Sequence, residues 1–163
     1  MILCKSIKCY MDLSISNYKY KNKYLMYLNN LYNLNKELFY KKVNEVEFYD
    51  KILFDFKGYN NIFVFLLNKY KDKININLQG DYGGTILHLL IWYCEYDLFK
   101  EVLLMYKDKF DINSQNVFGD TVLYLLIKQE QYDLFKEVFD MFKDGVDDEL
   151  YNYCVKNIKK LGI

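Results

Sequence analysis

The heptapeptide "YDLFKEV" stands twice in this chain, at Tyr96–Val102 and again at Tyr132–Val138. The two copies lie 36 positions apart in a chain of 163 residues. The similarity extends upstream at the same period, because "GGTILHLLI" at 83–91 pairs with "GDTVLYLLI" at 119–127. Self-similarity at a fixed period of about 20–50 residues is the mark of a stacked array. We therefore predict that the chain is built by stacking one small repeat.

An earlier copy of the repeat is visible further upstream. The segment "YKDKFDIN" at 106–113 matches "YKDKININ" at 70–77 with the same spacing, although the first half of this earlier copy lacks the Gly-Xaa-Thr opening. We predict repeats over about 46–80, 81–116 and 117–146, followed by a closing helix over 147–161. Residues 1–45 are expected to form a divergent helical N-terminal cap or a degenerate repeat.

Each repeat has the pattern helix, tight turn, helix and then a long turn or hairpin. Thr85 can cap a first helix, a break follows at about 94–96, and Asp97 or Asp133 begins the second helix. A polar segment then leads to a glycine such as Gly119, which suits a positive φ. The apolar residues of the second helix in the later copy form one helical stripe: Leu134, Phe135, Val138, Phe139 and Phe142. The predicted fold class is all-α, with neighbouring repeats covering each other's stripes.

Composition narrows the class of protein. The chain is 52% hydrophobic and 27% charged, which is typical of a globular protein. Lys+Arg and Asp+Glu balance at 22 each, so the net charge predicts neither nucleic-acid nor membrane binding. The four cysteines show no CxxC spacing, and the start of the chain is too interrupted by lysines for a signal segment. We expect a soluble cytoplasmic protein with free thiols.

Candidate chemistry is sparse, and each candidate has a structural alternative. His88 is the only histidine; it could be a base or a metal ligand, but a structural role in the turn is the favoured interpretation. The run Asp147–Glu149 could hold a cation, but negative charge is ordinarily found at a helix start, which is the favoured interpretation. Cys4 and Cys9 could bind zinc with His88 or another cysteine, but their spacing is loose for a structural zinc site. The stretch "YKYKNKY" at 18–24 could contact RNA, yet we expect a solvated helix start or linker. We predict no enzyme activity, no catalytic residue, no metal and no cofactor.

The duplicated segments resemble the ankyrin-repeat family. "GGTILHLLI" and "GDTVLYLLI" are similar to the opening Gly-Xaa-Thr-Pro-Leu-His-Xaa-Ala-Ala, and "DIN" at 111–113 is similar to the Asp-Val-Asn that leads into the family's hairpin. The resemblance covers about two thirds of the chain. Ile86 and Val122 replace the family's proline, and the pairs 90–91 and 126–127 replace its two alanines with Leu-Ile. The fold that the resemblance implies is a solenoid of stacked helix-turn-helix repeats with short hairpin loops.

The resemblance also implies a function, because ankyrin repeats are protein-binding scaffolds that use their hairpin tips and the concave face of the first helices. The expected partner is a protein, a host protein and an immunity-type target both being left open, and we expect a monomer. Self-association through the aromatic surface is the alternative. The family's contact positions fall on these residues: Phe56, Lys57, Asp81, Tyr82, Gly84, Trp92, Tyr93, Val117, Phe118, Asp120, Lys128 and Gln129.

Overall fold

The computed structural model describes residues 30–45, 49 and 60–162, and this part of the chain is helical with no strand. The prediction of an all-α protein is confirmed to that extent. The chain divides into two compact units, residues 1–78 and residues 79–163. The predicted repeats at 81–116 and 117–146 and the closing helix all fall within the second unit. Of the N-terminal cap or degenerate repeat predicted over 1–45, residues 1–29 lie outside the described residues, and so does most of the opening of the first predicted repeat, at 46–48 and 50–59.

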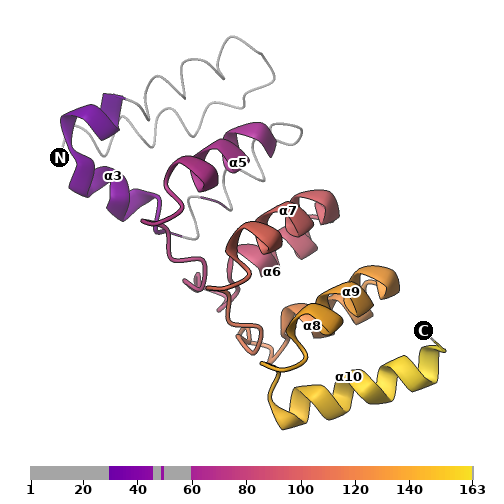
Figure 1. The fold of residues 1–163 in the computed structure, drawn as a ribbon. Helices are drawn as coiled ribbons and strands as arrows, with labels where there is room; N and C mark the ends of the chain where they lie inside the picture. Colours follow the sequence, from indigo (N-terminus) through magenta and orange to yellow (C-terminus); the bar gives the residue numbers. More distant parts are fainter. Residues whose placement is uncertain (1–29, 46–48, 50–59, 163) are drawn as a thin grey trace. The chain divides into compact units, whose positions relative to one another are not determined.

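The first compact unit contains the helices α3 (Lys36–Lys42) and α5 (Asn60–Lys69) (Figure 1). Asn35 caps α3, where its side-chain oxygen accepts the N–H of Leu38 at 2.9 Å. Phe39 is buried against Tyr70, and their ring centroids lie 4.6 Å apart. Aromatic packing of this kind joins two helices that are far apart in the sequence.

The second compact unit is made of two helix pairs and a closing helix. The pairs are α6 (Ile86–Trp92) with α7 (Tyr96–Tyr106), and α8 (Val122–Lys128) with α9 (Tyr132–Phe142). The closing helix is α10 (Asp148–Leu161), which confirms the helix predicted over 147–161. Figure 1 shows the two pairs and α10 following one another as successive layers.

The helix boundaries follow from local chemistry that repeats in both pairs. Thr85 and Thr121 stand at the N-caps of α6 and α8, as predicted for Thr85. The breaks within the pairs are single residues in the left-handed region, Cys94 and Glu130, each with φ of 59°. The second helices α7 and α9 begin one residue earlier than predicted. Asp97 therefore lies in the first turn of α7, where its negative charge favours the helix dipole.

The core lies where the two helices of each pair meet and where layers cover one another. Leu90 and Ile91, which replace the small pair of the ankyrin pattern, are completely buried. The same holds for Phe99 and Phe135, which occupy the same position of the duplicated heptapeptide. The bulky residues are thus accommodated inside the stack, and they supply apolar area that alanines would not.

Asparagine side chains link one layer to the next. Asn113 donates from Nδ2 to the carbonyl of Gly145 at 2.9 Å, and its Oδ1 accepts the N–H of Asp147 at 3.0 Å. Within the first unit, Asn44 makes the same pair of bonds to Lys73 and Asn75, both at 2.8 Å. Each asparagine satisfies two main-chain groups at once. Asn113 thereby holds the turn after α9, and Asn44 holds the turn after α5. In the sequence, Asn113 was considered only as part of the segment "DIN" at 111–113, and this role was missed.

Candidate functional site

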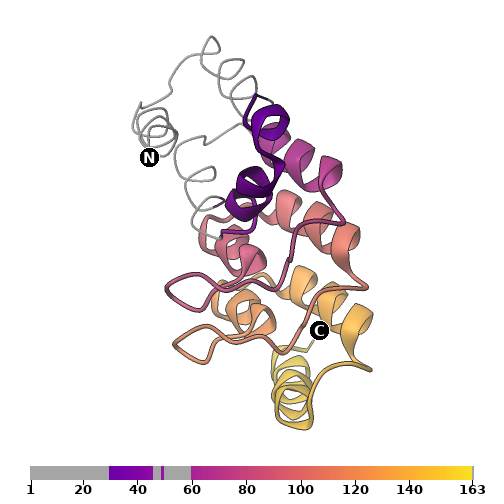
Figure 2. The ribbon, with the colours of Figure 1, turned by 90° about the vertical axis from the view of Figure 1, so that its left-hand side faces the viewer.

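Two loops of the second unit project side by side from the same side of the helix pairs, at residues 79–85 and 115–121 (Figure 2). Each loop closes like a hairpin, through Gly80 N–H to Gly84 C=O at 3.0 Å and through Asn116 N–H to Asp120 C=O at 3.0 Å. Neither loop contains an assigned strand, so the predicted hairpin loops are tight turns. Gly83 has φ of 68°, as the turn requires.

The two loops are hydrogen-bonded to each other. The N–H of Val117 donates to the carbonyl of Tyr82 at 3.0 Å. The side chain of Gln79 donates from Nε2 to the carbonyl of Gln115 at 2.7 Å. The main chains of the two loops are also in close contact, because a Cβ added at Gly83 would lie 2.9 Å from the nitrogen of Val117. The tips are therefore one joined surface.

Three apolar side chains stand exposed on this joined surface, and we call them the tip patch: Tyr82, Val117 and Phe118. Their exposed fractions are 68%, 62% and 73%. Among the described large apolar side chains only five are more than half exposed, and three of these form the tip patch. Exposed aromatic rings on a rigid support are typical of protein interfaces. All three were predicted to be contact residues, and in the structure they lie together on the two joined loops.

Asn116 shapes the second tip, and sequence reasoning missed it. Its Oδ1 accepts the N–H of Phe118 at 2.8 Å and that of Asp120 at 3.0 Å. The residue is only 6% exposed, so these bonds are made away from solvent. The signal that could have revealed it is the segment "NVFG", because an asparagine in a turn commonly accepts the main-chain N–H two residues on, as an Asx turn.

Asp120 and Lys128 occupy different places from those expected of contact residues. Asp120 is buried, and its carbonyl lies 3.1 Å from Nε2 of His88. Its carboxylate faces Lys128, whose Nζ lies 3.2 Å away. Lys128 also stands over the ring of Tyr124 at 5.1 Å from the centroid. Asp120 is thus a structural residue of the loop, which corrects the expectation, while Lys128 stays half-exposed but internally paired.

The remaining predicted contact residues are spread over less exposed places. Trp92 is half-buried and covers Gly84, since a Cβ added at Gly84 would lie 2.8 Å from the indole ring. Tyr93 is half-buried too, and Asp81 is exposed beside the tip patch. Gln129 is engaged internally.

The hydroxyl that engages Gln129 belongs to Tyr96, which donates to its Oε1 at 2.6 Å. Burial, together with the neighbouring Cys94, raises the pKa of Tyr96 to about 12, so the phenol stays protonated as a donor. Gln129 is therefore part of the contact between the two inter-helix turns. Phe56 and Lys57, the two expected contact residues of the earliest repeat, lie outside the described residues.

His88 is held at both ring nitrogens in the interior of the second unit. Nδ1 accepts the N–H of Thr85 at 3.1 Å, so Nε2 carries the proton and donates it to the carbonyl of Asp120. Burial lowers the pKa of His88, and the bond to Asp120 only partly opposes this effect. The imidazole is buried and neutral, and each of its ring nitrogens makes a hydrogen bond. This environment agrees with the structural role that was favoured from the sequence. The ring closes the α6 cap and fastens it to the next loop.

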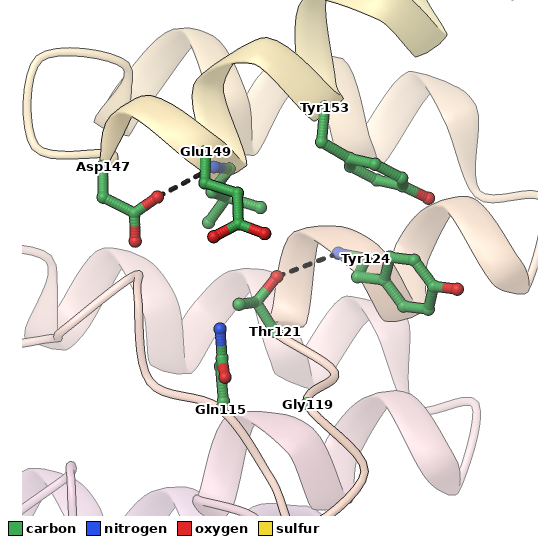
Figure 3. Close-up of a pocket in the computed structure, with 8 residues that line it drawn as sticks. Gln115, Gly119, Thr121, Tyr124, Asp147, Glu149 and Tyr153 are labelled. Atoms are coloured by element: carbon green, nitrogen blue, oxygen red, sulfur yellow. Dashed lines mark hydrogen bonds between the residues drawn. The ribbon is translucent and has the colours of Figure 1, made fainter.

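A shallow groove opens beside the second tip, between the α8 layer and the start of α10, with a volume of about 200 Å³. Figure 3 shows the carboxylates of Asp147 and Glu149 on its α10 side, with Gln115 and Thr121 opposite them. The rings of Tyr124 and Tyr153, whose centroids lie 5.1 Å apart, close one end. The groove was not foreseen in the sequence, where the run Asp147–Glu149 was weighed as a cation site and interpreted as a helix start.

Two further findings concern the described residues as a whole. They contain no group of three or more His, Cys, Asp or Glu side chains that could hold a metal ion. None of the helices in this part of the chain is both long and apolar enough to cross a membrane.

Comparisons with known proteins returned no relative. No family model, no curated protein and no solved structure matches this chain.

Proposed function

We propose that this chain is a non-enzymatic, ankyrin-like protein-binding module of the cytoplasm, which contacts a protein partner through its tip patch. The proposed architecture is a solenoid in which the 36-residue repeats form successive layers. Three observations support this architecture: the duplicated sequence segments, the helix pairs and the projecting loops.

The observation that carries the proposal is the joined, exposed tip patch of Tyr82, Val117 and Phe118. Large apolar side chains at loop tips lose contact with water only when another surface covers them. Here the bond from Val117 N–H to Tyr82 C=O ties both loops before any partner arrives. Little backbone entropy is then lost on binding, which favours affinity for a given contact area.

Affinity capture with a triple variant tests the proposal. The native chain and Tyr82→Ala/Val117→Ala/Phe118→Ala are used as baits in lysate of the source cell, with mass spectrometry of the captured proteins. We expect one partner to be captured by the native chain and lost with the triple variant. The matched control is Leu104→Ala on α7, because Leu104 is also an exposed large apolar residue, at 57%.

Two measurements keep the test decisive. Far-UV circular dichroism must show equal helicity for all three baits, so that loss of capture is not loss of fold. Light scattering over a range of concentrations separates the alternative of self-association. A partner that survives in the triple variant would reject the tip patch as the binding surface, and a mass that rises with concentration only in the native chain would favour self-association.

A further inference from the structure

The two compact units carry opposite charges, which the zero net charge of the whole chain conceals. Residues 1–78 contain 13 lysines against 7 acidic residues, whereas residues 79–163 contain 9 lysines against 15 acidic residues. The tip patch and the groove both belong to the acidic unit. A charge surplus of this kind favours encounters with a basic partner over an acidic one.

The groove lies where the repeat pattern would place one more loop. Gln79 donates its side-chain amide to the carbonyl of Gln115 in the next loop, one period later. Gln115 occupies the same repeat position, but the next element is α10 and not a loop. Its side-chain amide opens onto the groove and has no partner among the described residues.

The main chain is left open at the same edge. The carbonyl of Tyr82 accepts the N–H of Val117 from the following loop. Phe118 stands one period after Tyr82, and no described residue donates a hydrogen bond to its carbonyl. An amide donor at Phe118 C=O and a carbonyl at the Gln115 amide would repeat the bonds that join the two loops. An extended peptide backbone supplies both groups, as in strand addition to a sheet edge.

The groove then selects the side chain that such a peptide carries. Figure 3 shows the carboxylates of Asp147 and Glu149 facing into the groove. Asp147 uses Oδ1 to cap α10 at Leu150, at 2.8 Å, and Glu149 has no partner among the described side chains. No lysine lines the groove. The ring of Tyr124 already accepts an ammonium group on one side, that of Lys128.

We propose that the open edge at Gln115 and Phe118 binds an extended segment of the protein partner, and that the groove takes a lysine or arginine side chain of that segment. Backbone bonds hold the segment beside the second tip, and the carboxylates of Asp147 and Glu149 pair with its cation. This inference rests on the proposed function and adds to it the chemistry of the partner. It makes the tip patch and the groove two parts of one continuous surface.

Titration with short peptides tests this proposal on the full chain. The probe is acetyl-Thr-Val-Lys-Val-Thr-amide, whose β-branched residues favour an extended form. Its controls carry norleucine or glutamate in place of lysine. Amide resonances of the ¹⁵N-labelled protein are followed, and we expect the lysine peptide to shift Gly119, Thr121 and Leu150. The norleucine peptide should bind severalfold more weakly, and the glutamate peptide should leave these resonances unmoved.

A charge-matched pair of variants locates the site. Asp147→Asn/Glu149→Gln removes both carboxylates of the groove while asparagine still caps α10. Its control is Asp144→Asn/Asp148→Asn, which removes two exposed charges that do not line the groove. We expect the first variant to weaken the lysine peptide by about two- to tenfold and the second by less than about twofold, as for exposed ion pairs.

Three outcomes would overturn the inference. The first is equal binding of the lysine and norleucine peptides, and the second is equal loss in the two variants, which would indicate only a long-range field. The third is a shift of the same resonances when the protein is concentrated without peptide, because a second copy would then be the occupant. The proposed function would survive the first two if the triple tip-patch variant still lost its partner, so the two failures are distinguishable.

Discussion

At the scale of single residues, the buried environment of His88 requires its ring to be neutral. Its ring is completely buried, Nδ1 accepts the N–H of Thr85, and Nε2 donates to Asp120 C=O. Protonation of Nδ1 would remove the acceptor that completes the α6 cap. Because burial also lowers the pKa of His88, the folded chain resists taking up this proton.

The expected consequence is a loss of stability in mild acid. An unfolded histidine titrates at about pH 6.5. The contribution of neutral His88 is therefore fully present above that pH and falls as the pH drops below it, towards the lowered pKa of the folded state. We expect the free energy of unfolding, from urea titrations between pH 7.5 and pH 5.5, to decrease over the lower half of this range.

His88→Gln is the control for this pH dependence. His88 is the only histidine of the chain, so no other imidazole contributes in the same range. The variant should be less stable at pH 7.5, by about 2 kcal/mol for its lost buried hydrogen bonds, with a much flatter pH profile. An unchanged slope in the variant would show that another group titrates there.

Gly84 and Gly145 form a second matched pair at this scale. A Cβ at Gly84 would lie 2.8 Å from the indole of Trp92, whereas the nearest atom to one at Gly145 is 3.6 Å away. Alanine at Gly145 restricts the unfolded chain without a clash, so Gly145→Ala should stabilise by about 0.5 kcal/mol. Gly84→Ala must displace the indole and should be about 1 kcal/mol less stable than Gly145→Ala.

Fluorescence reads the same pair independently. Trp92 is the only tryptophan, so its emission reports directly on the ring that covers Gly84. We expect a red shift in Gly84→Ala as the ring moves towards water, and no shift in Gly145→Ala. Identical spectra for both variants would contradict the packing of Trp92 on Gly84.

The exposure of the candidate contact residues was predictable from the sequence where it follows from their position in a loop. Tyr82, Val117 and Phe118 lie between helical segments and outside any apolar stripe, and they are exposed as this placement implies. Asp120 was assigned wrongly to the contact surface because its burial depends on Lys128 and on His88 from the neighbouring layer. The internal hydrogen bond of Gln129 was missed in the same way, because its donor Tyr96 belongs to another repeat. Such partners are not adjacent in the sequence.

At the scale of elements, Asn113 fixes the start of α10. Its two hydrogen bonds hold the main chain at Gly145 and Asp147, the turn that leads into this helix. Asp147 in turn accepts the N–H of Leu150 as the N-cap. The last helix is thus aligned by a chain of three side-chain contacts and not by apolar packing alone.

Removing this link should loosen α10 before the rest of the second unit. Asn113→Ala leaves two main-chain groups without their partner and should cost about 1–2 kcal/mol of unfolding free energy. Asn113→Asp keeps the acceptor for Asp147 N–H and should cost less. Urea titrations give the free energies of unfolding. If Asn113→Asp were no more stable than Asn113→Ala, the result would contradict the pair of bonds.

Helix boundaries were predictable to within one residue in the duplicated region. The closing helix, the threonine caps and the glycine turns all follow from local signals that act within one turn. The starts of α7 and α9 were placed one residue late because Asp97 and Asp133 were taken as the first residues of these helices. The caps are Glu95 and Gln131, neither of which makes a side-chain capping bond, so no local signal marks them.

At the scale of the molecule, each layer of the second unit depends on its neighbours. The α8 layer meets α6 on one side and the groove with α10 on the other. The tail of α10 has exposed lysines at Lys159 and Lys160 and no further layer among the described residues of this unit. In a stacked array, stability is the sum of such nearest-neighbour terms.

Hydrogen exchange should reveal this order. We expect the slowest amides at Leu125 and Leu126 of the interior layer, and exchange faster by at least about tenfold in the last turn of α10, because helix ends fray locally. Exchange measured by NMR at fixed pH checks this prediction. Equal protection from α6 to the end of α10 would instead indicate a single all-or-none unit.

The architecture was more predictable than the surface. Helix pairs and their period follow from the sequence, since each repeat carries its own caps and apolar stripe. The groove could not be foreseen, because it arises where α10 replaces a loop beside Gln115 and Tyr124. Nor did the balanced total of charges reveal the acidic second unit, whose limits only the structure supplies.

The bonds that join the two loops have a consequence for how such a chain can grow. Gln79, Val117 and His88 all bond to main-chain atoms of the adjacent loop, so these contacts do not depend on which side chains follow. A second copy of residues 83–118, spliced in after Phe118, would meet the same carbonyls on both sides. One in-frame duplication of 36 codons could therefore lengthen the protein by a layer without inventing a new contact, and the twin heptapeptide has the form that such an event leaves behind.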